Sequence, residues 1–161
     1  IEVSRELAID ALNEIRKSIS TLRTELLQGK SLTETINLLI ENFYKITNIR
    51  ANLFINIRQP LKTDINIAIY RIIQESLTNI SKHSNATTVD IILEQQIECI
   101  HLRIEDNGQG FNKSENTTGF GLQGIDERVR ALGGRFIVNS TLETGCKIIV
   151  DIPLSEFDFS E

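Results

Sequence analysis

The sequence predicts an α+β domain in which helices cover one face of a mixed β-sheet, with one long helix preceding the sheet. Segments with helical periodicity alternate along the chain with segments of strand-like alternation. In the second half, adjacent pairs of strand-like segments are separated by a helix, an order typical of a mixed sheet with helices on one face. At 161 residues the chain can bury a core without a disulfide or a metal.

The first expected element is a helix over residues 2–27 with an apolar seam. Its apolar residues recur at spacings of four and three and are Ala8, Leu12, Ile15, Ile19, Leu22 and Leu26. Such a heptad seam suits a partner helix, and the sequence before it supplies none. Pairing with a second chain, pairing with a missing helix and packing on the chain's own domain are the three alternatives.

The other elements follow from capping, periodicity and turn signals. Ser31 with Glu34 forms a capping box for a helix that ends at about Thr47. The remaining elements are a strand at 51–57, a helix at 64–84, paired strands at 88–94 and 100–105, a helix at 122–132, and paired strands at 135–140 and 146–152. Residues 155–161 form a short acidic tail.

A carboxylate, Asp106, stands in the apolar register of the strand that precedes it. Side chains alternate between the faces of a strand, so Asp106 shares its face with the apolar residues at alternate positions before it. A buried carboxylate is costly unless a donor meets it. Because Gly108 and Gly110 follow, and glycine lets the backbone approach a ligand closely, this pattern indicates a ligand site.

A second glycine cluster, residues 119–124, leads directly into the helical pattern of residues 125–132. Free backbone N–H groups and the positive end of the helix dipole favour an anion at such a place. A glycine-rich turn before a helix is equally typical of a plain loop, so this cluster alone leaves both interpretations open.

The expected helix at 64–84 has an apolar stripe and, beside it, a polar stripe of Glu75, Asn79 and Lys82. Glu75 and Asn79 are one helical turn apart, so their oxygens can reach one hard cation, and Lys82 can reach a phosphate on the same side. The alternative interpretation is a solvated helix face.

In this order, the three patterns resemble the ATP-binding domain of the GHKL superfamily, and within it the sensor histidine kinases of the nitrate-sensor and lipid-fluidity-sensor type. The matching segments are residues 70–84, 106–111 and 119–129, followed by 132–134. The resemblance implies a two-layer α/β sandwich, the Bergerat or GHKL fold, over residues 31–154. It also implies that residues 1–28 are the second helix of a dimerisation and phosphoacceptor bundle whose first helix is absent.

The implied activity is transfer of the ATP γ-phosphate to a histidine, with Mg²⁺ as cofactor. Asn79 would bind Mg²⁺ and Lys82 would neutralise phosphate charge, while Glu75 would bind or orient the metal through water, or act as a general base. Asp106 would accept a hydrogen bond from the adenine amino group. The implied nucleotide-binding residues are Asp106, Gly108, Gly110, Phe111, His83, Gly119, Gly121, Leu122, Gly124 and Cys146.

Three details of the resemblance concern one loop and two single residues. Residues 111–118 would form a short lid over the nucleotide. Cys146 stands where the family usually has threonine near adenine, and a thiol is a poor hydrogen-bond donor. His83 is expected at the helix end or lining the site.

Neither histidine of the chain, His83 or His101, matches the phosphoacceptor motif. His101 is expected to be an ordinary, partly exposed strand residue. The resemblance therefore implies a kinase fragment that cannot phosphorylate itself without the acceptor helix. It also implies a homodimeric parent and a response regulator receiver domain as partner.

Composition excludes several classes of protein. The net charge of −5 argues against nucleic acid as the main partner, and no apolar run is long enough to cross a membrane. Cys99 and Cys146 lie in separate strand-like segments without metal-ligand spacing, which favours apolar packing and a reducing, cytoplasmic setting. The chain contains no Met, so we expect a piece of a longer protein.

Three functional classes remain open. The first is the catalytic domain of a sensor histidine kinase, which the helix at residues 2–27 favours. The second is a GHKL ATPase or an anti-sigma-type serine kinase; in the ATPases Glu75 would activate water. The third is a nucleotide-binding regulatory module without phosphotransfer, against which the intact Glu75, Asn79 and Asp106 argue.

Overall fold

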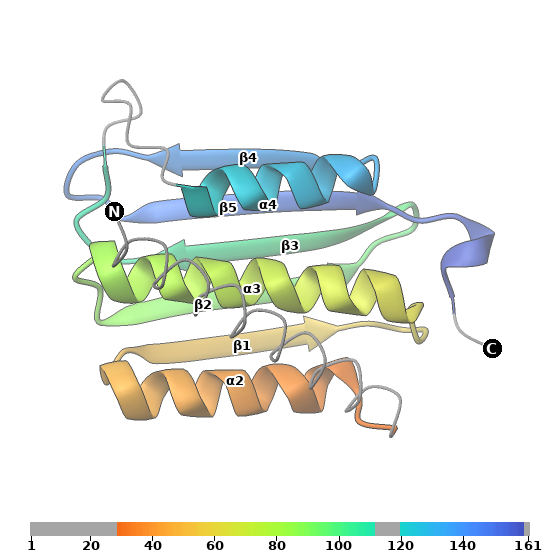
Figure 1. The fold of residues 1–161 in the computed structure, drawn as a ribbon, viewed down its shortest axis with the longest axis horizontal. Helices are drawn as coiled ribbons and strands as arrows, with labels where there is room; N and C mark the ends of the chain where they lie inside the picture. The colour runs from red at the N-terminus through yellow and green to blue at the C-terminus, as the bar shows by residue number, and fades with distance from the viewer. Residues whose placement is uncertain (1–28, 112–119, 160–161) are drawn as a thin grey trace, which may run out of the picture.

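The computed structural model describes residues 29–111 and 120–159. Within them, five strands form one sheet with the order β1-β2-β3-β5-β4 (Figure 1). The strands are β1 (Arg50–Asn56), β2 (Thr88–Gln95), β3 (Cys99–Asp106), β4 (Arg135–Ser140) and β5 (Cys146–Pro153). The helices are α2 (Leu32–Thr47), α3 (Thr63–His83) and α4 (Phe120–Ala131), and a short 3-10 helix, η1 (Glu156–Asp158), follows β5.

The sheet is mixed, as predicted. β1 pairs with β2 in parallel, and the other neighbouring strands pair antiparallel. A parallel pair needs a crossover connection, and α3 provides it between β1 and β2. The predicted α+β class is therefore confirmed for the part of the chain that the structure describes. The expected helix at residues 2–27 lies outside that part.

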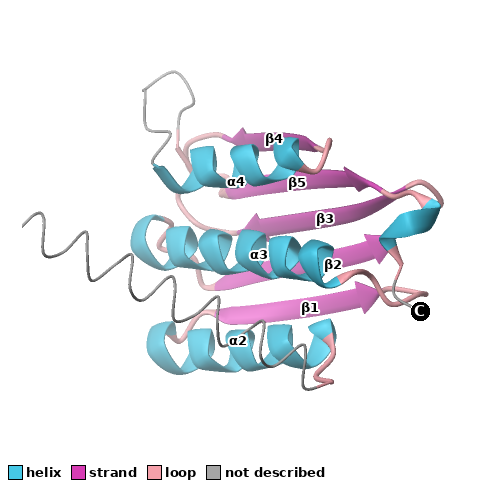
Figure 2. Cartoon of the chain, turned by 45° about the vertical axis from the view of Figure 1, so that its right-hand side comes forward, coloured by secondary structure: helices cyan, strands magenta, loops and turns pink. Residues whose placement is uncertain are grey.

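The three helices α2, α3 and α4 lie side by side on one face of the sheet (Figures 1 and 2). α3 is the middle helix and contacts both of the others. In the described ranges the opposite face of the sheet carries no helix, so the molecule there has two layers. None of the described helices combines the length and the apolar character that crossing a membrane requires.

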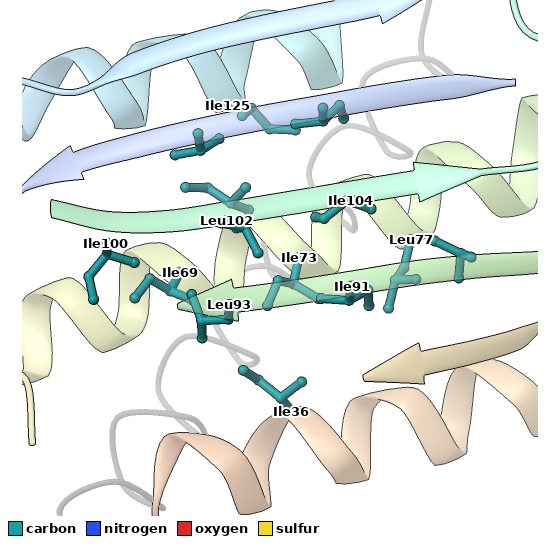
Figure 3. Close-up of a cluster of buried hydrophobic side chains, with 14 of the residues drawn as sticks. Ile36, Ile69, Ile73, Leu77, Ile91, Leu93, Ile100, Leu102, Ile104 and Ile125 are labelled. Atoms are coloured by element: carbon teal, nitrogen blue, oxygen red, sulfur yellow. The ribbon is translucent and has the colours of Figure 1, made fainter. Parts of the chain in front are cut away.

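The core lies between the helices and the sheet (Figure 3). Its buried side chains include Ile36 from α2, Ile69, Ile73 and Leu77 from α3, Ile125 from α4, and Ile91, Leu93, Ile100, Leu102 and Ile104 from β2 and β3. Burying one such side chain stabilises the fold by about 1.5–3 kcal/mol. The burial of several such side chains together stabilises the fold by more than the burial of one polar side chain, such as Asp106, costs.

The capping box predicted at the start of α2 is confirmed. The Ser31 hydroxyl accepts a hydrogen bond from the Glu34 N–H at 3.2 Å, and the Ser31 N–H donates to the Glu34 carboxylate at 2.7 Å. The helix ends at Thr47, where Asn48 adopts a left-handed conformation with φ 57°. Asn tolerates this conformation better than most residues, which explains why the chain turns there.

The segment after β5 folds back toward the start of α3. Phe159 forms an isolated bridge with Leu61, and the Lys62 N–H donates to the Asp158 carbonyl at 2.9 Å. At η1 the Ser155 N–H and hydroxyl donate to Asp158 Oδ2 at 2.6 and 2.7 Å, and the Ser155 carbonyl accepts from the Asp158 N–H at 3.1 Å. The described part of the acidic tail, residues 155–159, is thus attached to the end of the domain that bears the N-terminus of α3.

Candidate functional site

Asp106 ends β3 on the face covered by helices and is 5% exposed. The strand register therefore predicted its burial correctly. Its Oδ1 accepts a hydrogen bond from the Gly108 N–H at 2.8 Å. Burial raises the pKa of Asp106, and the backbone hydrogen bonds from Gly108 and Cys146 only partly oppose this shift. The result is a buried carboxylate with neutral backbone donors and capacity for a further donor.

The loop after Asp106 is packed between the end of α3 and the turn that joins β4 to β5. A Cβ added at Gly108 would overlap the Ser84 carbonyl oxygen, and one added at Gly110 would overlap the carbonyl oxygen of Thr141. Glycine is required at both positions because the backbone of the loop lies directly against the backbone at Ser84 and at Thr141. The sequence predicts that these glycines make room for a ligand, which stays a prediction, and the structure shows that they let the loop pack closely.

Gly145, in the turn between β4 and β5, completes this packing. It adopts a left-handed conformation with φ 78°, and a Cβ there would overlap the Asp106 carbonyl oxygen. Gly145 is not among the site residues that the sequence predicts. Its position directly before Cys146, at the start of a strand, was the signal that could have found it.

The polar stripe of α3 faces the first turn of α4. A Cβ added at Gly121 would lie 2.5 Å from Glu75 Oε1 and 2.8 Å from both polar side-chain atoms of Asn79. Glu75 and Asn79 are half-buried, whereas Lys82 is exposed. The structure thus brings Glu75, Asn79 and Gly121 into contact, at the N-terminal end of a helix where backbone N–H groups favour an anion.

The remaining predicted site residues lie around this centre. The Phe111 N–H donates to the Ser140 hydroxyl at 2.9 Å, and the Gly124 carbonyl accepts from the Arg128 guanidinium at 3.2 Å. Leu122 and Cys146 are partly buried and pack against the core. His83 is exposed at the end of α3. Gly119 and residues 112–118 of the lid expected at 111–118 lie outside the described residues.

The donor set of the site fits magnesium better than a transition metal. Among the residues described, no three or more His, Cys, Asp or Glu side chains are grouped so as to hold a metal ion. Glu75 and Asn79, held together under Gly121, offer one carboxylate and one amide oxygen. Mg²⁺ characteristically takes only one or two protein ligands and completes its shell with phosphates and water, so these two residues fit it.

A second charged cluster lies on the face of the sheet away from the helices. His101 Nδ1 is 2.7 Å from Asp151 Oδ1, and Arg135 Nη2 is 2.8 Å from Asp151 Oδ2. Cys99 is half-buried on this face, and its thiol donates to Gln96 Oε1 at 3.5 Å. Apolar packing was the expectation for both cysteines, and it holds for Cys146 but is wrong for Cys99.

Comparison with solved structures gives the class of the domain. The structure superposes on the ATP-binding domain of PrrB from Mycobacterium tuberculosis with a TM-score of 0.64, covering 79% of this chain and 96% of that one. The two sequences are 16% identical, so this similarity shows the fold alone. The described part of the chain therefore has the fold of this ATP-binding domain.

Sequence comparison gives the family. The family of histidine kinase-, DNA gyrase B-, and HSP90-like ATPases matches residues 64–156, and the chain belongs to this family. It is 32% identical over 153 residues to the signal transduction histidine-protein kinase/phosphatase DegS of Brevibacillus brevis, covering 94% of this chain and 40% of that protein. It is 31% identical over 155 residues to the sensor histidine kinase LiaS of Bacillus subtilis (strain 168), covering 96% of this chain and 43% of that protein.

The chain thus spans less than half the length of these two relatives. Membership of the family implies that the chain binds ATP.

Proposed function

We propose that the chain binds Mg-ATP and transfers its γ-phosphate to a histidine on a separate helix, as the catalytic domain of a sensor histidine kinase. The observation that carries this proposal is the arrangement of two polar groups within the fold of this family. One is the buried carboxylate of Asp106, and the other is the contact of Glu75 and Asn79 with Gly121. The names of the relatives support the choice of reaction.

Asp106 is suited to recognise adenine. Its carboxylate is buried, it is met by neutral backbone donors, and it keeps acceptor capacity for an amino group. A hydrogen bond to a charged acceptor in a buried site is worth about 1.5–3 kcal/mol, enough to select a purine that carries an amino group. The hydrogen bond from Gly108 orients the carboxylate before any ligand arrives.

The phosphates would lie at the other end of the site, along α3 and the first turn of α4. Phosphoryl transfer depends mostly on positioning and on neutralisation of charge. Asn79 and Glu75 would hold Mg²⁺, which when bound would neutralise the phosphates. Lys82 follows Asn79 by three residues on the same side of α3 and is exposed, so its ammonium group can reach a phosphate.

Glu75 also favours a second candidate function, ATP hydrolysis. A half-buried carboxylate beside Asn79 has the chemistry of a general base for water. In the kinase the same carboxylate would bind or orient the metal through water, or would accept a proton from the histidine. Hydrolysis and phosphotransfer thus differ in which nucleophile reaches the phosphate next to Glu75.

The acceptor histidine would come from outside the described domain. His101 is engaged with Asp151 on the face of the sheet away from the helices, and His83 is an exposed residue of α3 whose carbonyl is bound by Gln109. We therefore assign the acceptor to a separate helix, in a homodimeric parent protein. A response regulator receiver domain would then take the phosphoryl group from that helix in the cytoplasm.

Calorimetric titration tests the binding half of this proposal. ADP and a nonhydrolysable ATP analogue are titrated into the chain with and without Mg²⁺, and magnesium-dependent binding is expected. The chain is then mixed with an acceptor helix and labelled ATP. Acid-labile, base-stable label on the helix is the expected result, and phosphate release without label would favour the ATPase. Stable phosphohistidine on the chain alone would contradict the assignment of the acceptor.

Asn79→Ala separates metal binding from adenine binding. Removing the amide oxygen is expected to lower the rate of magnesium-dependent transfer by about 100-fold, because one ligand of the metal is lost. Affinity for adenosine, which carries no phosphate, is expected to stay unchanged. A variant that transfers phosphate at the normal rate would remove Asn79 from the metal site.

A further inference from the structure

Gln109 connects three separate parts of the chain. Its backbone N–H donates to the Ser84 carbonyl at 2.7 Å, and its carbonyl accepts from the Glu143 N–H at 2.6 Å. Its side-chain Nε2 donates to the His83 carbonyl at 2.7 Å, and its Oε1 lies 3.4 Å from the donating Nδ2 of Asn85. Gln109 therefore joins the loop after β3 both to the end of α3 and to the turn between β4 and β5.

The connection to α3 satisfies groups that the helix leaves open. The last carbonyls of an α-helix have no partner within the helix. Those of His83 and Ser84 lie at the end of α3, and Gln109 supplies a donor to each of them. Asn79 and Lys82 lie within the last turns of the same helix, so Gln109 ties the loop after β3 to the part of α3 that carries them.

The loop after β3 also has hydrogen bonds that do not involve the side chain of Gln109. The neighbouring Asn107 holds the loop independently, since its Oδ1 accepts from the N–H groups of Thr87 and Thr88 at 2.9 and 3.0 Å. The main-chain hydrogen bonds of Gln109 to Ser84 and Glu143 do not involve its side chain. The side-chain amide of Gln109 therefore adds only the tie to His83 and Asn85.

We propose that Gln109 is a positioning residue for nucleotide binding. Its side-chain amide clamps the loop that directly follows Asp106 to the end of α3, and so sets Asp106 and Asn79 at the spacing that one nucleotide requires. This inference rests on the proposed function. A ligand that contacts only the loop, such as adenosine, does not need the clamp. A ligand that spans the loop and α3, such as ADP with Mg²⁺, does need it.

The test compares Gln109→Ala with Gln95→Ala in the full chain. Gln95 is a matched control because its side-chain amide likewise bonds with backbone: its Oε1 accepts from the N–H groups of Arg58 and Gln59 at 2.9 and 3.0 Å. It lies at the far end of β2, since Gln95 pairs with Ile100 whereas the first residues of β2 pair near Asp106. Both substitutions thus remove an amide from a backbone tie, and only one of them touches the site.

Affinities for adenosine and for ADP with Mg²⁺ are measured by calorimetry. Gln109→Ala is expected to weaken ADP binding about threefold to tenfold and to change adenosine binding by less than about twofold. Gln95→Ala is expected to bind both ligands like the unmodified chain. The ratio of the two affinities is the decisive quantity, because a purely structural role for Gln109 would leave it unchanged.

Two results would overturn the inference while the proposed function stands. Equal weakening of both ligands would show that Gln109 serves the loop alone, and unchanged affinity for both would show that the clamp has no role in binding. If the unmodified chain binds neither ligand, the proposed function fails and the inference falls with it.

Discussion

Asp106 and Asp151 occupy opposite faces of the same sheet and meet opposite partners. Asp106 faces the helices, is 5% exposed and accepts hydrogen bonds from two backbone N–H groups. Asp151 lies on the face without helices in the described part of the chain, and it accepts from His101 at 2.7 Å and from Arg135 at 2.8 Å. One carboxylate is thus met by neutral donors and the other by basic side chains.

The different hydrogen-bond partners of Asp106 and Asp151 also shift their pKa values in opposite directions. Burial raises the pKa of Asp106, and its backbone hydrogen bonds only partly oppose that shift. Burial also acts to raise the pKa of Asp151, but the hydrogen bonds from Arg135 and His101 outweigh it and hold the pKa below its usual value. Asp151 is thus paired with basic side chains of its own sheet. The partners of Asp106 are backbone N–H groups, which leave its carboxylate acceptor capacity for the ligand that we propose.

The largest effect is expected from Gly145→Ala, which disturbs the backbone that presents Asp106. The new Cβ would overlap the Asp106 carbonyl oxygen, and the left-handed backbone at Gly145 is strained for alanine. Together these costs should lower the free energy of unfolding by about 3 kcal/mol, as measured by urea denaturation.

Gly124→Ala is the matched control for that experiment. Gly124 lies inside α4, where an added Cβ would meet only Arg128 Nη1 at 3.6 Å, an ordinary contact. Alanine is the better helix former, so the variant should gain about 0.5–1 kcal/mol of stability. If Gly145→Ala were as stable as Gly124→Ala, the turn between β4 and β5 would not be what holds Asp106.

The next effect is on binding. Asp106→Asn is expected to weaken ATP binding about 10-fold to 100-fold, because the amide replaces a charged acceptor by a neutral one and turns a donor toward the adenine amino group. The domain should remain folded, since the substitution removes a buried charge. Asp151→Asn is the control and should leave the affinity unchanged. Calorimetry measures both variants, and normal affinity in Asp106→Asn would exclude Asp106 from adenine recognition.

The sequence was sufficient to predict Asp106 because its signal is local. Side chains alternate strictly along β3, so a carboxylate in the apolar register had to be buried. The mixed sheet and the capping box at Ser31 followed from equally local patterns, and the structure confirms both. α4 begins at Phe120, two residues before the predicted start, because a glycine-rich segment gives no clear helix start.

Gln109 and Gly145 could not be predicted in the same way. Gln109 acts through the end of α3, about 25 residues away in the sequence, and through Glu143 in another turn. Gly145 is required because the Asp106 backbone passes close to it, a contact that depends on how β3 and β5 pair. Contacts of this kind depend on the assembled fold, whereas a periodic pattern carries no information about them.

The smallest effect is expected in the pH dependence of stability, where Asp106 and Asp151 should differ in sign. The folded-state pKa of Asp106 lies above its ordinary value of 3.8. Between these two values the native state binds more protons than the unfolded state, so this group's contribution to stability falls as pH rises. Asp106→Asn should therefore gain stability relative to the unmodified chain at neutral pH, and the gain should disappear as pH falls toward 3.8.

Asp151 should behave in the opposite way, because its folded-state pKa lies below 3.8. Its contribution is present above that ordinary value and is lost as pH falls through the folded-state pKa. Asp151→Asn should thus cost about 1 kcal/mol or less at neutral pH, since the pairs with His101 and Arg135 are partly exposed, and the cost should vanish in acid. Urea denaturation of both variants from pH 7 to about pH 3 measures the two curves. If the two substitutions changed the free energy of unfolding in the same direction at neutral pH, Asp106 and Asp151 would not differ in the electrostatic effect of their surroundings. The assignment of Asp106 as the ligand-binding carboxylate would then lose its electrostatic basis.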